Sequence, residues 1–280
     1  MDQIWTFDCE WAPDITAGRR LYHLPPDVPD DEVLRVMWQE GGATPEDPQP
    51  FLKTLLCRVV SIAMVVRKVP GPSDAGKEPE LKLVTLPSLD SDDPENPSYD
   101  ERRLLKTFLS FWFAKCKPVF VGFNSRNADL HILAQRAIVN GISAPEFAER
   151  VSAKPWNSPD VDLMEIVGGR GRSYGCSLHE IANLCGIPGK LDTTGDDVAG
   201  LFYGGKLRNI VEYNAFDALT TYLVWLRTEL FAGRLTPESH AEEERRLRDL
   251  VMAERAKPHG EYLSRYLAVW DSQNAAPAYQ

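Results

Sequence analysis

The sequence lacks the features of secreted, membrane-spanning and zinc-stabilised proteins. Its N-terminus has neither the basic region nor the apolar core of a signal peptide, and no stretch approaches the roughly 18 consecutive apolar residues of a membrane span. The five cysteines are scattered without a C-x-x-C pair, an odd number that suits reduced thiols better than disulfides or structural zinc. We therefore expect a cytoplasmic protein that has no membrane partner.

The chain also lacks an excess of positive charge. It carries 31 Lys and Arg against 41 Asp and Glu, a formal net charge of −10, which argues against a protein that coats nucleic acid through a broad basic surface. An enzyme that grips a few nucleotides stays possible, because acids gathered around bound cations present a neutralised surface to a phosphate. At 280 residues and 43% hydrophobic content, the chain is long enough to bury a sizeable core.

The pattern of apolar residues predicts an α/β domain, in which three strands form an antiparallel meander before a helix and a further strand. The predicted strands are, in chain order, 5–11, 58–68, 81–86 and 118–124. The predicted helices are 30–40, 101–116, 128–140, 177–186 and 207–231. Ser177 is the expected N-cap of the fourth of these helices.

Two segments differ from this pattern. Residues 12–50 are rich in Pro, Asp and Gly and form a long insertion, which we expect to be a mobile flap. From residue 233 the chain is charged and helical, and its last stretch, 271–280 (DSQNAAPAYQ), has the composition of a disordered tail. We predict a main domain over 1–232 and a charged helical extension with a disordered tail over 233–280.

Acidic residues lie at the ends of three predicted elements. Asp8 and Glu10 share one face of the first strand, where two carboxylates repel each other unless a cation lies between them. Asp129 begins a helix that follows an apolar strand, and Asp217 lies one turn after Tyr213 on the long helix. Each acid alone is best explained as a solvated side chain. Together they supply about the number of oxygen ligands that two divalent cations, roughly 4 Å apart, require.

Three stretches carry these acids in a fixed order: FDCEWAPD (7–14), VGFNSRNADLHIL (121–133) and YNAFD (213–217). In that order and spacing they resemble the motifs of the DEDD 3'-5' exonucleases of the ribonuclease H-like superfamily, in the branch similar to the exonuclease domain of family B DNA polymerases. The Y-x-x-x-D form of the third motif resembles the tyrosine subclass, and Glu212 stands where the histidine subclass has its His. The intervening sequence looks like that of stand-alone bacterial members. The resemblance covers about residues 3–232.

The resemblance implies a ribonuclease H-like fold with a mixed five-stranded sheet flanked by helices. It also implies a metal-dependent exonuclease that releases nucleoside monophosphates from the 3' end of single-stranded nucleic acid, with DNA as the favoured strand. Asp8, Glu10, Asp129 and Asp217 would hold two Mg²⁺ or Mn²⁺ ions, and Tyr213 would orient the attacking water. An exoribonuclease that trims RNA 3' ends and a non-catalytic module that binds strand ends stay open as alternatives.

Other residues of these stretches are weaker candidates. Asn124 could bind the terminal nucleotide and Lys190 a substrate phosphate, although a turn-forming Asn and a surface Lys explain the two equally well. Asp162 is expected at a helix N-terminus. Many relatives have an aromatic residue where this chain has Ala128, which removes a packing or base-stacking group. A polymerase or repair partner would act in trans, and the oligomeric state stays open.

Overall fold

The computed structural model describes residues 3–71, 76–90, 97–168, 175–189, 191 and 198–275. The strands of this part of the chain are β1 (Gln3–Pro13), β2 (Cys57–Lys68), β3 (Glu80–Leu86), β4 (Val119–Gly122) and β5 (Val161–Asp162). The helices of the first half are α1 (Ile15–Leu21), α2 (Asp30–Glu40), η1 (Thr54–Leu56), α3 (Glu101–Leu105), η3 (Lys106–Phe113), α4 (Ala114–Cys116) and α5 (Asp129–Val139). Those of the second half are α6 (Pro145–Ser152), η4 (Pro155–Asn157), α7 (Leu163–Gly168), α8 (Leu178–Leu184), α9 (Val198–Tyr203), α10 (Leu207–Phe231), α11 (Pro237–Arg255) and α12 (Leu263–Ala275).

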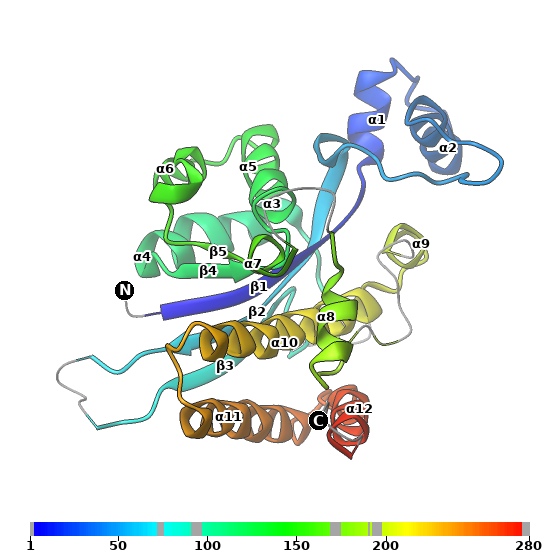
Figure 1. Cartoon of the computed structure of the whole chain (residues 1–280). Helices are drawn as coiled ribbons and strands as arrows, with labels where there is room; N and C mark the ends of the chain where they lie inside the picture. The colour runs from blue at the N-terminus through cyan, green and yellow to red at the C-terminus, as the bar shows by residue number, and fades with distance from the viewer. Residues whose placement is uncertain are drawn as a thin grey trace.

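The strands form one mixed sheet in the order β3-β2-β1-β4-β5 (Figure 1). β2 pairs antiparallel with both β1 and β3, which confirms the predicted meander. β4 runs parallel to β1, and the two-residue β5 runs parallel to β4. β5 was not among the strands predicted from apolar runs, because two residues are too few to show a pattern. The predicted mixed five-stranded sheet flanked by helices is nevertheless confirmed.

The alternation of side chains along β1 divides the interior into two cores. Trp5 and Phe7 point to the face covered by α3, η3 and α5, where they pack against Phe108 and Phe120. Residues of even number point to the opposite face, where the Thr6 hydroxyl donates a hydrogen bond to the carbonyl of Ala218 on α10. Asp8 and Glu10 therefore continue the row of side chains that faces α10.

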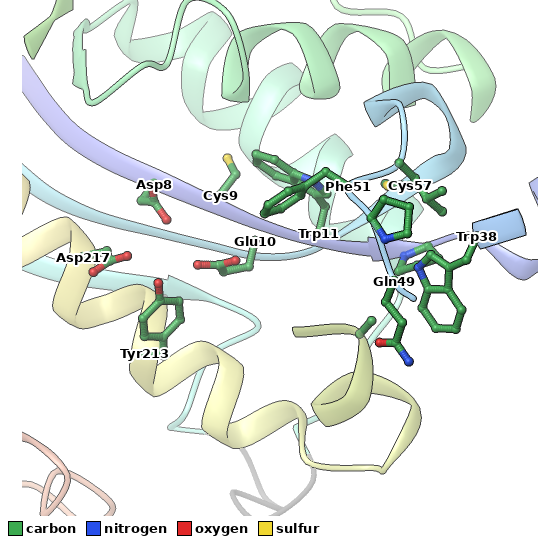
Figure 2. Close-up of a pocket in the computed structure, with 14 residues that line it drawn as sticks. Asp8, Cys9, Glu10, Trp11, Trp38, Gln49, Phe51, Cys57, Tyr213 and Asp217 are labelled. Atoms are coloured by element: carbon green, nitrogen blue, oxygen red, sulfur yellow. The ribbon is translucent and has the colours of Figure 1, made fainter. Parts of the chain in front are cut away.

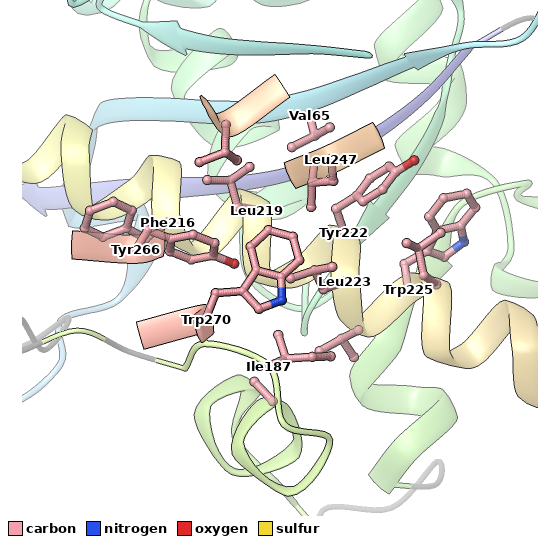
Figure 3. Close-up of a cluster of buried hydrophobic side chains, with 14 of the residues drawn as sticks. Val65, Ile187, Phe216, Leu219, Tyr222, Leu223, Trp225, Leu247, Tyr266 and Trp270 are labelled. Carbon is pink, nitrogen blue, oxygen red and sulfur yellow. The ribbon is translucent and has the colours of Figure 1, made fainter. Parts of the chain in front are cut away.

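The long helix α10 is buried around most of its circumference (Figure 1). The sheet lies on one side of it, and α8, α11 and α12 lie on the other. Figure 3 shows Leu247 of α11 and Trp270 of α12 among the side chains of this core, and the rings of Phe216 and Tyr266 stack there with centroids 5.5 Å apart. The extension after residue 232 thus packs against the sheet domain through apolar side chains.

The predicted disordered tail over 271–280 is wrong for its first half. Residues 271–275 continue α12, since Tyr266 and Trp270 fix the preceding turns in the core. Residues 276–280 lie outside the described part of the chain. Within the described residues, none of the helices has both the length and the apolarity needed to cross a membrane.

The other predicted elements are confirmed, with small differences at their ends. The predicted helix over 101–116 forms as one run, α3–η3–α4, whose middle turns have π-helical hydrogen bonds. Ser177 caps α8 through a capping box with Glu180. The insertion over 12–50 contains α1 and α2, which pack against each other around Val33 and Met37 and project from the end of β1 (Figure 1).

A buried carboxylate, Glu243, ties α11 to β2. It accepts hydrogen bonds from Arg67 (2.7 Å), from the Tyr222 hydroxyl (2.8 Å) and from Arg246 (3.0 Å). Burial by itself raises the pKa of Glu243, but the hydrogen bonds and positive charges of these partners outweigh it and lower the pKa below its ordinary value. Its contribution to stability is therefore complete above the unfolded pKa, near about 4.3, and is lost as pH falls through the folded pKa.

We expect Glu243→Gln to lower the free energy of unfolding by about 1–3 kcal/mol at pH 7, because the charge that pairs with Arg67 is lost. The difference from the unmodified protein should shrink as the pH is lowered from about 5 to 3, where Glu243 itself becomes neutral. Urea denaturation at several pH values measures it, with the exposed Glu261→Gln as the matched control. A difference that is the same at every pH would contradict this assignment.

Candidate active site

Three carboxylates from two elements meet between β1 and α10. Asp8 and Glu10 lie on the face of β1 that looks toward α10, and Asp217 extends from α10 toward them (Figure 2). One ligand oxygen of each of these acids lies within 4.8 Å of the others. Carboxylate oxygens at this spacing form a donor set that suits a hard divalent cation such as Mg²⁺ or Mn²⁺. These residues could therefore hold a metal ion.

Tyr213 lies one turn before Asp217 on α10, as the Y-x-x-x-D spacing predicts. Its hydroxyl points toward Asp217 and Glu10 (Figure 2), and its side chain is buried. Burial raises the pKa of Tyr213 far above its ordinary value, and the negative charges of Asp217, Glu10 and Asp8 raise it further. The hydroxyl accordingly stays protonated at neutral pH and acts as a hydrogen-bond donor.

Asp129 lies beside this group but is not one of the three. It begins α5 and accepts a hydrogen bond of 2.9 Å from the backbone N–H of Cys9. The pairing of β1 with β4 ends at Thr6 and Val121, so the Asp129 carboxylate serves as a partner for β1 beyond that point. Burial raises the pKa of Asp129, although its hydrogen bonds with the backbone oppose the shift.

The turn between β4 and α5 sets the position of Asp129. Asn124 has a left-handed backbone (φ 59°), its N–H donates to Asp162 (2.8 Å), and its side-chain oxygen accepts from Asn127 (3.1 Å). Asp162 also accepts from the backbone N–H groups of Arg126 and Met164, which confirms its expected place at a helix N-terminus. The structure thus shows Asn124 forming the turn. Lys190, the other weaker candidate, lies outside the described residues.

Beside the acids lies a cavity of about 220 Å³ with aromatic walls. β1 contributes Trp11, the insertion contributes Trp38, and Phe51 directly follows the insertion (Figure 2). This wall was not predicted, since residues 12–50 were expected to form a mobile flap. No local pattern indicated it, because Trp38 belongs to the predicted helix over 30–40 and Phe51 is a single aromatic residue just after the insertion.

A buried ion triad fixes the base of the insertion. Arg136 of α5 donates to Asp14 (2.7 Å) and twice to Glu101 (2.8 and 2.7 Å). Asp14 directly follows β1 and caps α1, and Glu101 also accepts from the N–H of Val59 on β2. This triad was not predicted either. Its signal was an arginine on the apolar face of α5, one turn after Leu133.

Comparisons with known proteins cover most of the chain. A family model described as a predicted 3'-5' exonuclease related to the exonuclease domain of PolB matches residues 49–270. The matched region includes Asp129, Tyr213 and Asp217, whereas Asp8 and Glu10 precede it. The structure nevertheless brings both of these earlier acids to Asp217.

Among solved structures, the family B DNA polymerase from the hyperthermophilic archaeon Pyrobaculum calidifontis is similar, at 17% sequence identity and a TM-score of 0.46. The similarity covers 82% of this chain and only 25% of the polymerase chain. None of the curated proteins matches the sequence.

Proposed function

Because this chain belongs to the family of predicted 3'-5' exonucleases related to the exonuclease domain of PolB, we propose that it hydrolyses single-stranded DNA from the 3' end and releases nucleoside monophosphates. The observation that carries this proposal is the meeting of Asp8, Glu10 and Asp217 within 4.8 Å. Carboxylates held so close repel one another, so their proximity is best explained by a site for divalent cations.

Each acid has a distinct place in the proposed site. Asp8, Glu10 and Asp217 would hold one divalent cation, and Asp129, beside the Cys9 backbone, would help to hold a second one. Such cations, when bound, activate the attacking water and stabilise the leaving 3'-oxygen. This arrangement is the two-metal form of phosphodiester hydrolysis.

Tyr213 supports the reaction as a hydrogen-bond donor. A phenol whose pKa lies above its ordinary value is a poor general base at neutral pH, so Tyr213 orients the water through its hydroxyl. The pairing of Tyr213 with Asp217 on one face of α10 also supports the tyrosine subclass. DNA is the proposed strand because the family is related to the exonuclease domain of a DNA polymerase.

The test is incubation of the protein with 5'-labelled single-stranded DNA and RNA of matched sequence, with Mg²⁺, Mn²⁺ or EDTA. We expect a descending ladder from the 3' end that requires metal and is formed faster on DNA, because activation of the water depends on the bound cation. A strand blocked at its 3' terminus is the control and should persist. A faster ladder on RNA would overturn the choice of strand. Strand binding without a metal-dependent product would overturn the catalytic proposal.

A further inference from the structure

The outer face of the helical run α3–η3–α4 is cationic, although the chain has a formal net charge of −10. Between residues 101 and 117 the exposed charged side chains are all positive: Arg102, Arg103, Lys106, Lys115 and Lys117. The acid of this stretch, Glu101, is buried in the ion triad with Arg136. A basic stripe along one helix is typical of a surface that binds a polyanion.

These cations differ from the exposed arginines of other helices. Arg35, Arg234 and Arg245 each pair with a carboxylate of their own neighbourhood. Within the part of the chain that the structure describes, the side chains of Arg103 and Lys106 take part in no ion pair. Their positive charge is therefore available to a ligand.

Part of the stripe lines a surface groove that also contains an exposed ring. The groove has a volume of about 320 Å³, and its lining residues are Asp100, Arg102, Arg103, Lys106, Thr107 and Phe111. The ring of Phe111 is 64% exposed. Asp100 is already engaged as the N-cap of α3, where it accepts a hydrogen bond of 3.0 Å from the backbone N–H of Arg103. The groove thus offers positive charge and an aromatic face side by side.

The π-helical turns of η3 explain why Phe111 reaches this groove. In an α-helix of 3.6 residues per turn, two residues five positions apart point about 140° away from each other. Hydrogen bonds from i to i+5 place Lys106 and Phe111 more nearly above one another, so both line the same groove. π-Helical turns are rare and are frequently found at functional sites.

The groove and the proposed metal site lie at opposite ends of α5. Asp129 begins α5, whereas Arg102 donates to the carbonyl of Asn140, the residue that follows α5. The 11 residues of α5 span about 16 Å at 1.5 Å per residue. A strand with stacked bases advances about 3.4 Å per nucleotide. A strand whose 3' end lies at the acids therefore reaches the groove after roughly five nucleotides.

We propose that this groove binds the single strand on the 5' side of the scissile end, with Arg103 and Lys106 on its phosphates and Phe111 against one of its bases. The role of the groove rests on the proposed function and adds a contact on the face of the sheet away from α10. A nucleic acid strand fits this surface because phosphates and aromatic bases recur together along it, and cations and rings bind those two parts. An acidic peptide would satisfy the cations alone.

The experiment measures binding of a 5'-labelled single-stranded DNA of about 20 nucleotides to the full chain in EDTA, so the readout does not depend on bound metal. The double variant Arg103→Gln, Lys106→Gln should raise Kd about tenfold at low salt. It should also reduce the slope of log K against log salt by about 1.4, because each lost phosphate contact on a single strand accounts for about 0.7. Phe111→Leu should raise Kd about fivefold and leave the slope unchanged, since stacking on a base involves no counterion.

A matched control removes the same charge elsewhere. The double variant Arg245→Gln, Arg248→Gln lies on α11, where both arginines are paired with acids, and it should leave Kd within about twofold. Cleavage with Mg²⁺ adds a test of position. Arg103→Gln, Lys106→Gln should raise KM for the long strand and not for a dinucleotide, which is too short to reach the groove.

Three results would overturn this assignment of the groove. They are unchanged strand binding by Arg103→Gln, Lys106→Gln, an equal loss in both double variants, and a rise in KM that is the same for the dinucleotide. Binding of an acidic peptide that contains one Phe, lost in Arg103→Gln, Lys106→Gln while strand binding is kept, would assign the groove to a protein partner instead. Failure of the proposed function is distinguishable, because it would appear as no metal-dependent cleavage by the unmodified protein, whereas strand binding is measured in EDTA.

Discussion

Replacing Asp217 with alanine should lower kcat/KM on single-stranded DNA by about three orders of magnitude or more. Asp217 is the only one of the three gathered acids that comes from α10, so its loss leaves the cation proposed between them with ligands from β1 alone. A metal ion contributes several kcal/mol to such a reaction, and each 1.36 kcal/mol corresponds to a tenfold change in rate. The loss also removes the carboxylate next to the Tyr213 hydroxyl. Steady-state kinetics with saturating Mg²⁺ measure the effect.

The same substitution should not unfold the protein. Asp217 is only 6% exposed and lies near Asp8 and Glu10, so without cations its negative charge is repelled by theirs. We expect Asp217→Ala to have a Tm in EDTA equal to or above that of the unmodified protein. Glu229→Ala, at the other end of α10, removes the same charge from an ion pair with Arg234 and should retain full activity. Activity of Asp217→Ala above about a tenth of normal would remove Asp217 from the site.

The parts of this site that the sequence predicts depend on short-range periodicity. Alternation along a strand puts Asp8 and Glu10 on one face, and a spacing of four puts Tyr213 and Asp217 on one side of a helix. These relations hold wherever the elements lie. Periodicity alone does not show which face of β1 the helix α10 covers. The resemblance of the three motifs to a known family indicated that Asp8 and Glu10 face Asp217. The structure then brought Asp8, Glu10 and Asp217 together.

The features that were missed depend on contacts between distant segments. Phe51 and Trp38 become a wall only because the insertion and the residue that follows it fold back beside β1, and nothing in their local pattern indicates that approach. The ion triad joins residues 14, 101 and 136 across three elements. The disordered tail was predicted from polar composition, whereas Trp270 and Tyr266 anchor the helix that precedes it. Composition describes a segment by itself, and tertiary packing overrode it here.

Arg136→Met should lower the free energy of unfolding by about 3–5 kcal/mol. The Arg136 side chain is 3% exposed and is the cation shared by the carboxylates of Asp14 and Glu101, both of which are also buried. Methionine retains much of the apolar length of the side chain but leaves two buried carboxylates without the cation that hydrogen-bonds them both. Removing one partner of a buried ion pair costs this much because the remaining charge cannot be solvated. Urea denaturation at pH 7 measures the loss.

Two further variants test whether the unpaired charges of Asp14 and Glu101 cause the loss of stability in Arg136→Met. Arg102→Met removes an exposed arginine of α3 that hydrogen-bonds the Asn140 carbonyl, and it should change stability by less than about 0.5 kcal/mol. Adding Glu101→Gln to Arg136→Met should restore part of the loss, because one of the unpaired charges is then neutral. A double variant less stable than Arg136→Met by the full cost of Glu101→Gln alone would contradict this coupling.

The triad also links the stability of the protein to the shape of the cavity beside the acids. Asp14 lies where β1 passes into the insertion, its N–H donates to the carbonyl of Leu56 at 2.8 Å, and its side chain caps α1. Without Arg136, this junction loses its tie to α5, while Asp8 and Glu10 stay fixed in the sheet by the pairing of β1 with β2. Arg136→Met, assayed well below its Tm, should therefore raise KM for single-stranded DNA more than it lowers kcat. A larger effect on kcat than on KM would show that the triad acts on the carboxylates and not on the aromatic wall.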